Sequence, residues 1–186
     1  MDSYKEELIK YLKNTEGHLM AEWTRDTTPL SELNAIAEDS LERKNPEGHI
    51  AALFIYHQLT FEIIRSLLIH ANFLIKLCLF PTKFCPKKYS TDSKFSELIN
   101  GLKYSINFKG KAIILSQADK INRLRNEFGH RIIENYSYND IEKKLANIKA
   151  IHEDIFKTWL VCLKDLTSLI NQAKKREVII KLLKNK

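Results

Sequence analysis

The sequence is poor in residues that interrupt a helix or cross-link a chain. Its 186 residues include five glycines, four prolines and three cysteines. Glycine and proline are the strongest helix breakers, and leucine, isoleucine, lysine and glutamate dominate the rest, so the composition favours helices. The cysteines, Cys78, Cys85 and Cys162, are odd in number and form no CxxC pair, and there is no glycine-rich phosphate loop. We therefore expect no disulfide framework, no metal site and no cofactor.

Long apolar runs are also missing. The longest, at 67–80, is interrupted by His70, Asn72 and Lys76, so it does not have the pattern of a membrane span. The first residues do not have the pattern of a secretory signal peptide. These two features predict a cytoplasmic protein without a membrane partner.

The positive charge is concentrated at one end of the chain. The formal net charge is +7, but residues 174–186 alone carry six basic residues and one acidic residue. The remainder has 24 basic and 22 acidic residues and is nearly balanced. Two readings of the basic end remain open, a surface that touches RNA or another polyanion and a solvated helical end.

The chain is predicted to form one helical domain followed by a short tail. A single domain is the default at this length, and we place it at 1–173, with a basic C-terminal helical tail at 174–186. Thr28-Pro29 and Asn45-Pro46 each combine a capping side chain with a proline suited to the first helical turn. Ser93 and Ser137, the latter followed by Asp140, are further expected caps. Together with the apolar spacing, these signals predict an all-α, up-and-down helical bundle with helices at 3–23, 28–44, 46–79, 93–102, 116–135 and 137–170, a loop at 80–92 and a break at 107–110. The segment 46–79 is either one long helix or two helices broken near His70.

The predicted helix at 46–79 is apolar on most of its sides, which is typical of the buried centre of a bundle. Its polar residues Gln58, Glu62, Arg65 and Ser66 fall on one stripe at helical spacing. This stripe is either a solvent-facing seam or one wall of a functional cleft. In the second case we expect Glu62 to pair with a cation of the motif described next.

The most informative stretch is 119–133, and its core is Arg125-Asn126-Glu127-Phe128-Gly129-His130. Asn126 and His130 are four residues apart and share a helix face, whereas Arg125 points roughly 140° away from His130 on an ideal helix. A long side chain and a bend at Gly129 would narrow that angle. Glycine inside a helix costs about 1 kcal/mol against alanine, so we expect another backbone to approach closely there. A core-facing stripe is predicted from Ile121, Leu124, Phe128, Ile132 and Ile133.

These residue types suit cleavage of RNA without a metal. Histidine titrates near neutrality and exchanges protons with a 2′-hydroxyl or a leaving oxygen. Arginine is permanently charged and grips phosphate oxygens in a fork, and preorganised positive charge is often a large catalytic contribution. Asparagine orients the phosphate or the ring. A two-fold dimer that pairs the segment with itself would double the set in one cleft.

Arg125, Asn126 and His130 resemble the signature of HEPN domains, in which an arginine precedes a histidine by several residues and a polar residue often follows the arginine. The resemblance implies a small bundle of four to six helices that forms a homodimer with paired motifs. It also implies a metal-independent ribonuclease (a hydrolase) in a toxin–antitoxin or antiviral defence system. An antitoxin or regulatory protein would then be a partner. It implies catalytic roles for Arg125, Asn126 and His130, and we add Glu62, Arg123 and Arg131 as substrate-binding residues. A tyrosine that one HEPN subgroup carries two residues after the histidine is replaced here by Ile132.

The same segment also resembles the mannitol operon repressor family, in which a short phenylalanine-containing helix precedes the motif; residues 95–102 are the counterpart here. That resemblance implies a non-catalytic helical dimer that acts as a regulator or as a module that binds a protein or nucleotide partner. A nucleotide sensor is a third reading. No helix-turn-helix is evident, so direct reading of DNA sequence is not indicated.

Overall fold

Every element in the part of the chain that the structure describes is a helix. The computed structural model describes residues 3–14, 28–87, 89, 93–135 and 137–184, without the side chains of 130–135 and of a few other helix residues. The elements are α1 (Ser3–Asn14), α2 (Thr28–Glu42), α3 (Pro46–Leu79), α4 (Phe95–Lys103), α5 (Lys111–Asn135), α6 (Tyr138–Leu145), α7 (Ile148–Lys174) and α8 (Glu177–Lys184). The predicted all-α helical bundle is confirmed.

The long central helix α3 begins and ends where the sequence predicts. The Asn45 side chain accepts a hydrogen bond from the Gly48 backbone N–H at 2.8 Å, and Pro46 occupies the first turn, where a missing N–H costs nothing. Half of the helix is buried, and it contacts α2, α4, α5, α6 and α7. Its apolar residues therefore face neighbours on most sides, as expected for the buried centre of a bundle.

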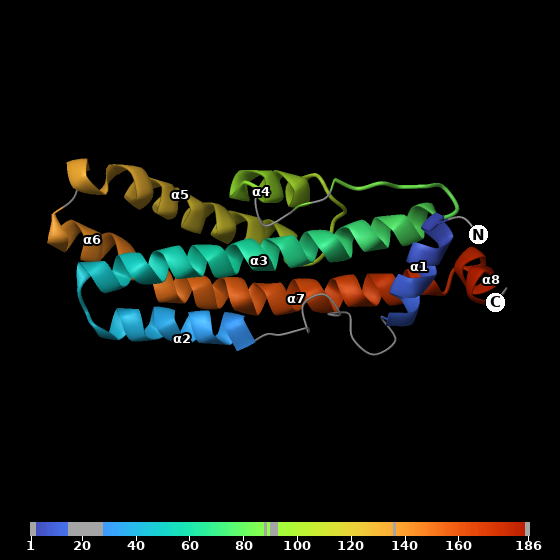
Figure 1. Ribbon diagram of the computed structural model, residues 1–186, viewed down its shortest axis with the longest axis horizontal. Coiled ribbons are helices and arrows are strands. Elements are labelled where there is room, and N and C mark those ends of the chain that lie inside the picture. The colour runs from blue at the N-terminus through green and yellow to red at the C-terminus, as the bar shows by residue number, and fades with distance from the viewer. Residues whose placement is uncertain (1–2, 15–27, 88, 90–92, 136, 185–186) are drawn as a thin grey trace.

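Four long helices run alternately in opposite directions along the molecule. In Figure 1, α2 and α5 run toward the end where α6 lies, and α3 and α7 run back from it. The predicted helix 137–170 is interrupted, and in this respect the prediction is wrong. The backbone leaves the helical region at Asn147, with φ −99° and ψ 8°, so α6 and α7 are separate helices. The predicted cap at Ser137 is confirmed as a capping box with Asp140.

Helix α5 starts five residues before the predicted Ser116. Gly110 has φ +84°, a left-handed value that favours glycine, and the helix begins directly after it. Lys111 is buried, and its Nζ donates to the carbonyls of Ser105 at 2.8 Å and Ile106 at 3.0 Å. The lysine thus fastens the start of α5 to the chain that follows α4.

Of two further expectations at the ends of elements, one is wrong and the other is tested only in part. The short helix α4 has Lys94 at its N-cap without a side-chain hydrogen bond, so the predicted cap at Ser93 is wrong. Helix α1 covers the first part of the predicted helix 3–23 and buries Leu8 and Leu12, whereas residues 15–27 lie outside the described part of the chain.

Part of the basic tail is folded onto the bundle. Ile179 of α8 is fully buried in the core. The Arg176 guanidinium donates to the backbone carbonyls of Leu77, at 2.8 Å, and Cys78 at the end of α3. A cation suits this place because the last carbonyls of a helix carry partial negative charge. Among the described residues, no helix is long and apolar enough to cross a bilayer.

Candidate functional site

The predicted motif lies in the C-terminal half of α5, and its described members are Arg125 and Asn126. His130 and Arg131 belong to the same helix, but their side chains lie outside the part that the structure describes. Asn126 is exposed and Arg125 is half-buried.

The described members of the predicted apolar stripe hold this half of α5 against the core. Ile121 and Phe128 are buried, and Leu124 packs against the core while partly exposed. The stripe is confirmed for these three residues, whereas Ile132 and Ile133 are among the side chains that are not described. The buried stripe fixes which way the helix faces, and that orientation leaves Asn126 in solvent.

The Arg125 guanidinium is held by an aromatic ring and an amide. Its Cζ lies 5.7 Å from the centroid of the Phe54 ring on α3, within the range of a cation–π interaction. Its Nη1 donates to Asn126 Oδ1 at 3.2 Å. Phe54 itself is 39% exposed, so the guanidinium rests on a ring at the surface of the bundle. The two contacts restrict where the positive charge lies, and the other guanidinium N–H groups have no hydrogen-bond partner among the described residues.

Gly129 lies directly beside this guanidinium. A Cβ at this position would be 3.8 Å from Arg125 Nη1 and 3.7 Å from the Phe54 ring. The nearest atoms are therefore side-chain atoms at ordinary contact distance, and the expected close approach of another backbone is wrong. The guanidinium thus extends along α5 toward Gly129, the residue before His130.

The carboxylates near the motif pair with other cations. Glu62 receives Arg65 Nη2 at 2.7 Å within α3, and Asp119 pairs with Arg123 at 2.7 Å within α5. Arg125 has no carboxylate partner within the described residues. The expected pairing of Glu62 with a motif cation is not what the structure shows, because the nearer Arg65 takes that place. Within the described residues, the charge of Arg125 is therefore not neutralised by a carboxylate.

A second polar group, His57, lies next to the motif, and the sequence analysis does not single it out. His57 Nε2 is 3.3 Å from Asn122 Oδ1, and the ring lies 4.5 Å from the Phe95 ring of α4. Burial lowers the pKa of His57, and the positive charge of Arg125 lowers it further, while the hydrogen bond with Asn122 raises it. His57 and Asn122 come from different helices, so no local spacing in the sequence signals their pairing.

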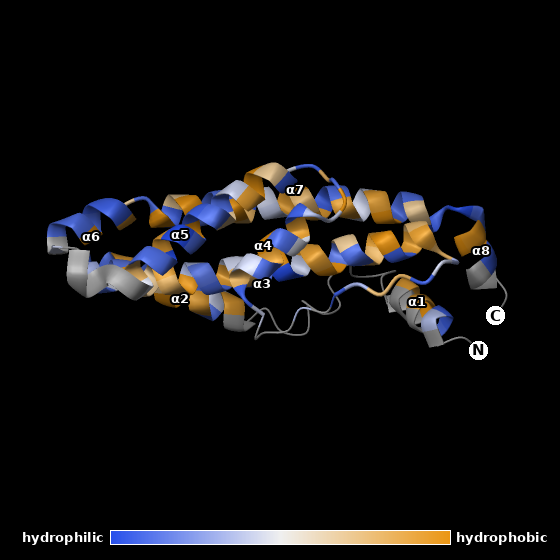
Figure 2. Cartoon of the chain, turned by 90° about the horizontal axis from the view of Figure 1, so that it is seen from above, coloured by the Kyte–Doolittle hydropathy of each residue, from blue (hydrophilic) through white to orange (hydrophobic). Residues whose placement is uncertain are grey.

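Helix α6 contacts the half of α5 that carries the motif. Lys144 of α6 donates to Glu127 of α5, so the acidic side chain inside the motif is neutralised by a neighbouring helix. Lys143, one residue earlier, is exposed. In Figure 2 the coloured residues of α6 are mostly hydrophilic. The surface beyond the motif is thus polar and carries basic side chains.

Among the described residues, no group of three or more histidine, cysteine, aspartate or glutamate side chains could hold a metal ion. A comparison of the chain with models of known protein families found no match, and neither did comparisons with curated proteins and with solved structures. In its described residues the protein is an all-α helical bundle.

Proposed function

We propose that this protein is a metal-independent endoribonuclease of the HEPN type, acting in a toxin or phage-defence system. The observation that carries the proposal is the placement of Arg125. Its guanidinium is half-buried, rests on Phe54, bonds to Asn126 and has no carboxylate partner within the described residues. A structural arginine at a bundle surface would gain most from a nearby carboxylate, whereas an anion-binding arginine has to remain available.

In the proposed reaction, a 2′-hydroxyl of RNA attacks the adjacent phosphorus. The bond from the 2′-oxygen to phosphorus forms, the bond from phosphorus to the 5′-oxygen breaks, and the products are a 2′,3′-cyclic phosphate and a 5′-hydroxyl. His130 takes the proton from the 2′-hydroxyl or returns one to the 5′-oxygen. Arg125 stabilises the negative charge that develops on the phosphate oxygens, and Asn126 orients the guanidinium through its side-chain oxygen.

A homodimer completes the proposed site. One chain supplies one Arg125 and one His130, whereas general acid and general base are separate tasks in this reaction. A two-fold axis beside α5 would place two copies of the motif in one cleft. The 39% exposed Phe54 ring is apolar surface next to the motif that a second copy would cover.

The proposal is tested by incubating the pure protein with a labelled RNA in the presence of a chelator. We expect fragments that end in a 2′,3′-cyclic phosphate, and no cleavage at a position where the 2′-hydroxyl is replaced by hydrogen. His130→Ala should abolish the activity. Binding of RNA without turnover, or fragments that still form at the 2′-deoxy position, would contradict the proposal and favour a non-catalytic binding module.

A further inference from the structure

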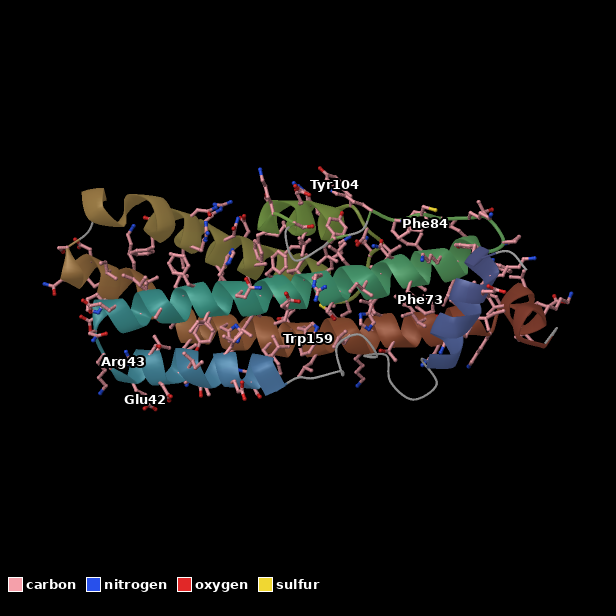
Figure 3. The ribbon with its side chains drawn as sticks, in the orientation of Figure 1. Glu42, Arg43, Phe73, Phe84, Tyr104 and Trp159 are labelled. Carbon is pink, nitrogen blue, oxygen red and sulfur yellow. The ribbon has the colours of Figure 1, made fainter. Side chains whose placement is uncertain are left out.

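A cavity of about 670 Å³ lies along the second half of α3, in the part of the molecule away from the motif. Its wall is formed by α1, by α3 and by the described part of the chain between α3 and α4. We call it the α1–α3 cavity. On α3 the wall extends from Arg65 to Lys76, a distance of about 16 Å along the helix axis. Figure 3 labels Phe73 on α3 and Phe84 in the chain beside it, and both belong to this wall.

Most of this wall is apolar, and part of it is open to solvent. Ile69 of α3, together with Phe84 and Pro86 of the following chain, lines the cavity and is partly exposed, as they are. Leu68 and Phe73, which belong to the core, also border the cavity. The volume falls within the range of small-molecule sites in proteins, which are mostly apolar with a few placed polar groups. An occupant would therefore bury an apolar chain or ring here.

The charged side chains in the wall are all basic. Among the described residues, Arg65, Lys76 and Lys87 line the cavity, and no aspartate or glutamate does. Arg65 pairs with Glu62 at 2.7 Å, and this carboxylate is not part of the wall. Lys87 pairs at 2.7 Å with Glu97, which is not part of the wall either. An anionic group in the cavity would thus contact cationic side chains and no carboxylate of the described wall.

Two of these cations lie at the same end of the cavity. A Cβ added at Gly101 of α4 would be 2.3 Å from the Tyr89 hydroxyl oxygen and 3.4 Å from a methyl carbon of Leu68. Tyr89 and Leu68 therefore meet at Gly101. Arg65 is less than one helical turn before Leu68, and Lys87 is two residues before Tyr89. The chain after α3 thus brings Lys87 to the part of α3 that carries Arg65.

Both cations keep hydrogen-bond donors beyond those that their carboxylate partners occupy. Arg65 directs Nε and Nη2 to Glu62 Oε2 at 2.9 and 2.7 Å, and its Nη1 makes no hydrogen bond with a described residue. The Lys87 ammonium has three donors and gives one to Glu97 Oε2. The Lys87 side chain is 62% exposed and that of Arg65 is 29% exposed, so a ligand in solution can reach them.

We propose that the α1–α3 cavity binds a small organic anion with an unbranched apolar chain, such as a medium-chain fatty acid, whose carboxylate pairs with Arg65 and Lys87. Carboxylates form charge-assisted hydrogen bonds with guanidinium and ammonium groups, and the apolar wall along α3 would cover the chain. An inorganic anion would leave the apolar wall uncovered, and an uncharged chain would leave the cations without a ligand partner. The proposal does not depend on ribonuclease activity.

The test uses decanoate as the probe and decanol, which has the same chain without the charge, as the control ligand. Two exposed cysteines report on the place of binding, because Cys85 lines the cavity and Cys78 does not. The full chain is treated with iodoacetamide, and the alkylation rate of each cysteine is followed by mass spectrometry. Decanoate should slow the alkylation of Cys85 saturably and leave that of Cys78 unchanged. Decanol should need an at least about tenfold higher concentration for the same protection.

The contribution of the cations is measured with Lys87→Met, which should raise the decanoate concentration for half-protection of Cys85 about fivefold. Lys94→Met is the matched control, because Lys94 is exposed and its charge also acts on Glu97, but it is not among the described lining residues. No protection of Cys85, equal protection by decanoate and decanol, or equal slowing of Cys78 would overturn the proposed site. Equal shifts in Lys87→Met and Lys94→Met would overturn the pairing of the carboxylate with Lys87.

Discussion

Replacing Phe54 with leucine removes the aromatic face under Arg125 and leaves an apolar side chain in its place. The guanidinium lies 5.7 Å from the ring centroid, and the ring is 39% exposed. For a cation–π pair at such a partly exposed site the expected interaction free energy is about 0.5–1 kcal/mol. The lost interaction free energy should appear as a coupling free energy between Phe54 and Arg125, which is the part of the double-mutant effect that the two single substitutions do not explain.

The assay is a double-mutant cycle of Phe54→Leu with Arg125→Met, in which the free energy of unfolding is measured by urea denaturation for all four proteins. Lys120, an exposed cation on the same helix, supplies the control cycle through Lys120→Met. We expect coupling in the first cycle and none in the second. Zero coupling between Phe54 and Arg125, or the same coupling for Lys120, would refute the placement of the guanidinium on the ring.

Three other predictions concern stability and are measured by denaturation. Gly129→Ala should stabilise the protein by about 1 kcal/mol, because there is room for the added Cβ and alanine favours the helix. Gly48→Ala should destabilise the protein by about 1–3 kcal/mol, because its Cβ would lie 2.0 Å from a backbone oxygen. The opposite order of the two stabilities would contradict the packing described. Because His152 has a folded-state pKa of about 4 and an ordinary value near 6.5, the unfolded chain binds the proton first as pH falls. Stability should therefore be full above about pH 6.5 and decrease by on the order of 3 kcal/mol toward pH 4, and a wild-type slope that persists in His152→Phe would refute this assignment. Arg176→Ala should cost about 1–2 kcal/mol and speed proteolysis of the tail, since its hydrogen bond to Leu77 is lost; an unchanged tail would contradict the fold of α8 onto the bundle.

The sequence predicts elements well where the signal is local. Asn45 and Pro46 mark the start of α3 because capping and the fixed φ of proline depend only on neighbouring residues. The capping box of Ser137 and Asp140 is local in the same sense. The start of α5 was missed because it depends on a left-handed Gly110 and on a buried Lys111 that reaches back to the end of α4. That reach is a tertiary contact, and periodicity within one segment cannot reveal it.

The candidate site likewise combines features that the sequence predicts with contacts that only the structure shows. Its residue types and their spacing on one helix could be read from the chain, including the apolar stripe of Ile121 and Phe128. The ring of Phe54 under Arg125 and the pairing of His57 with Asn122 join α3 to α5 across more than sixty positions of sequence. Glu62 was assigned to the site from its stripe, but Arg65, three residues away on the same helix, is the nearer partner.

We propose that Arg125 presents an available cation to the phosphate of an RNA substrate. The most direct test compares the initial rates of RNA cleavage by the wild type, Arg125→Ala and Lys120→Ala in the presence of a chelator. We expect the cleavage rate to fall by at least about a hundredfold in Arg125→Ala and to stay at the wild-type value in Lys120→Ala. Cleavage by Arg125→Ala at the wild-type rate, or equal losses in both variants, would contradict it.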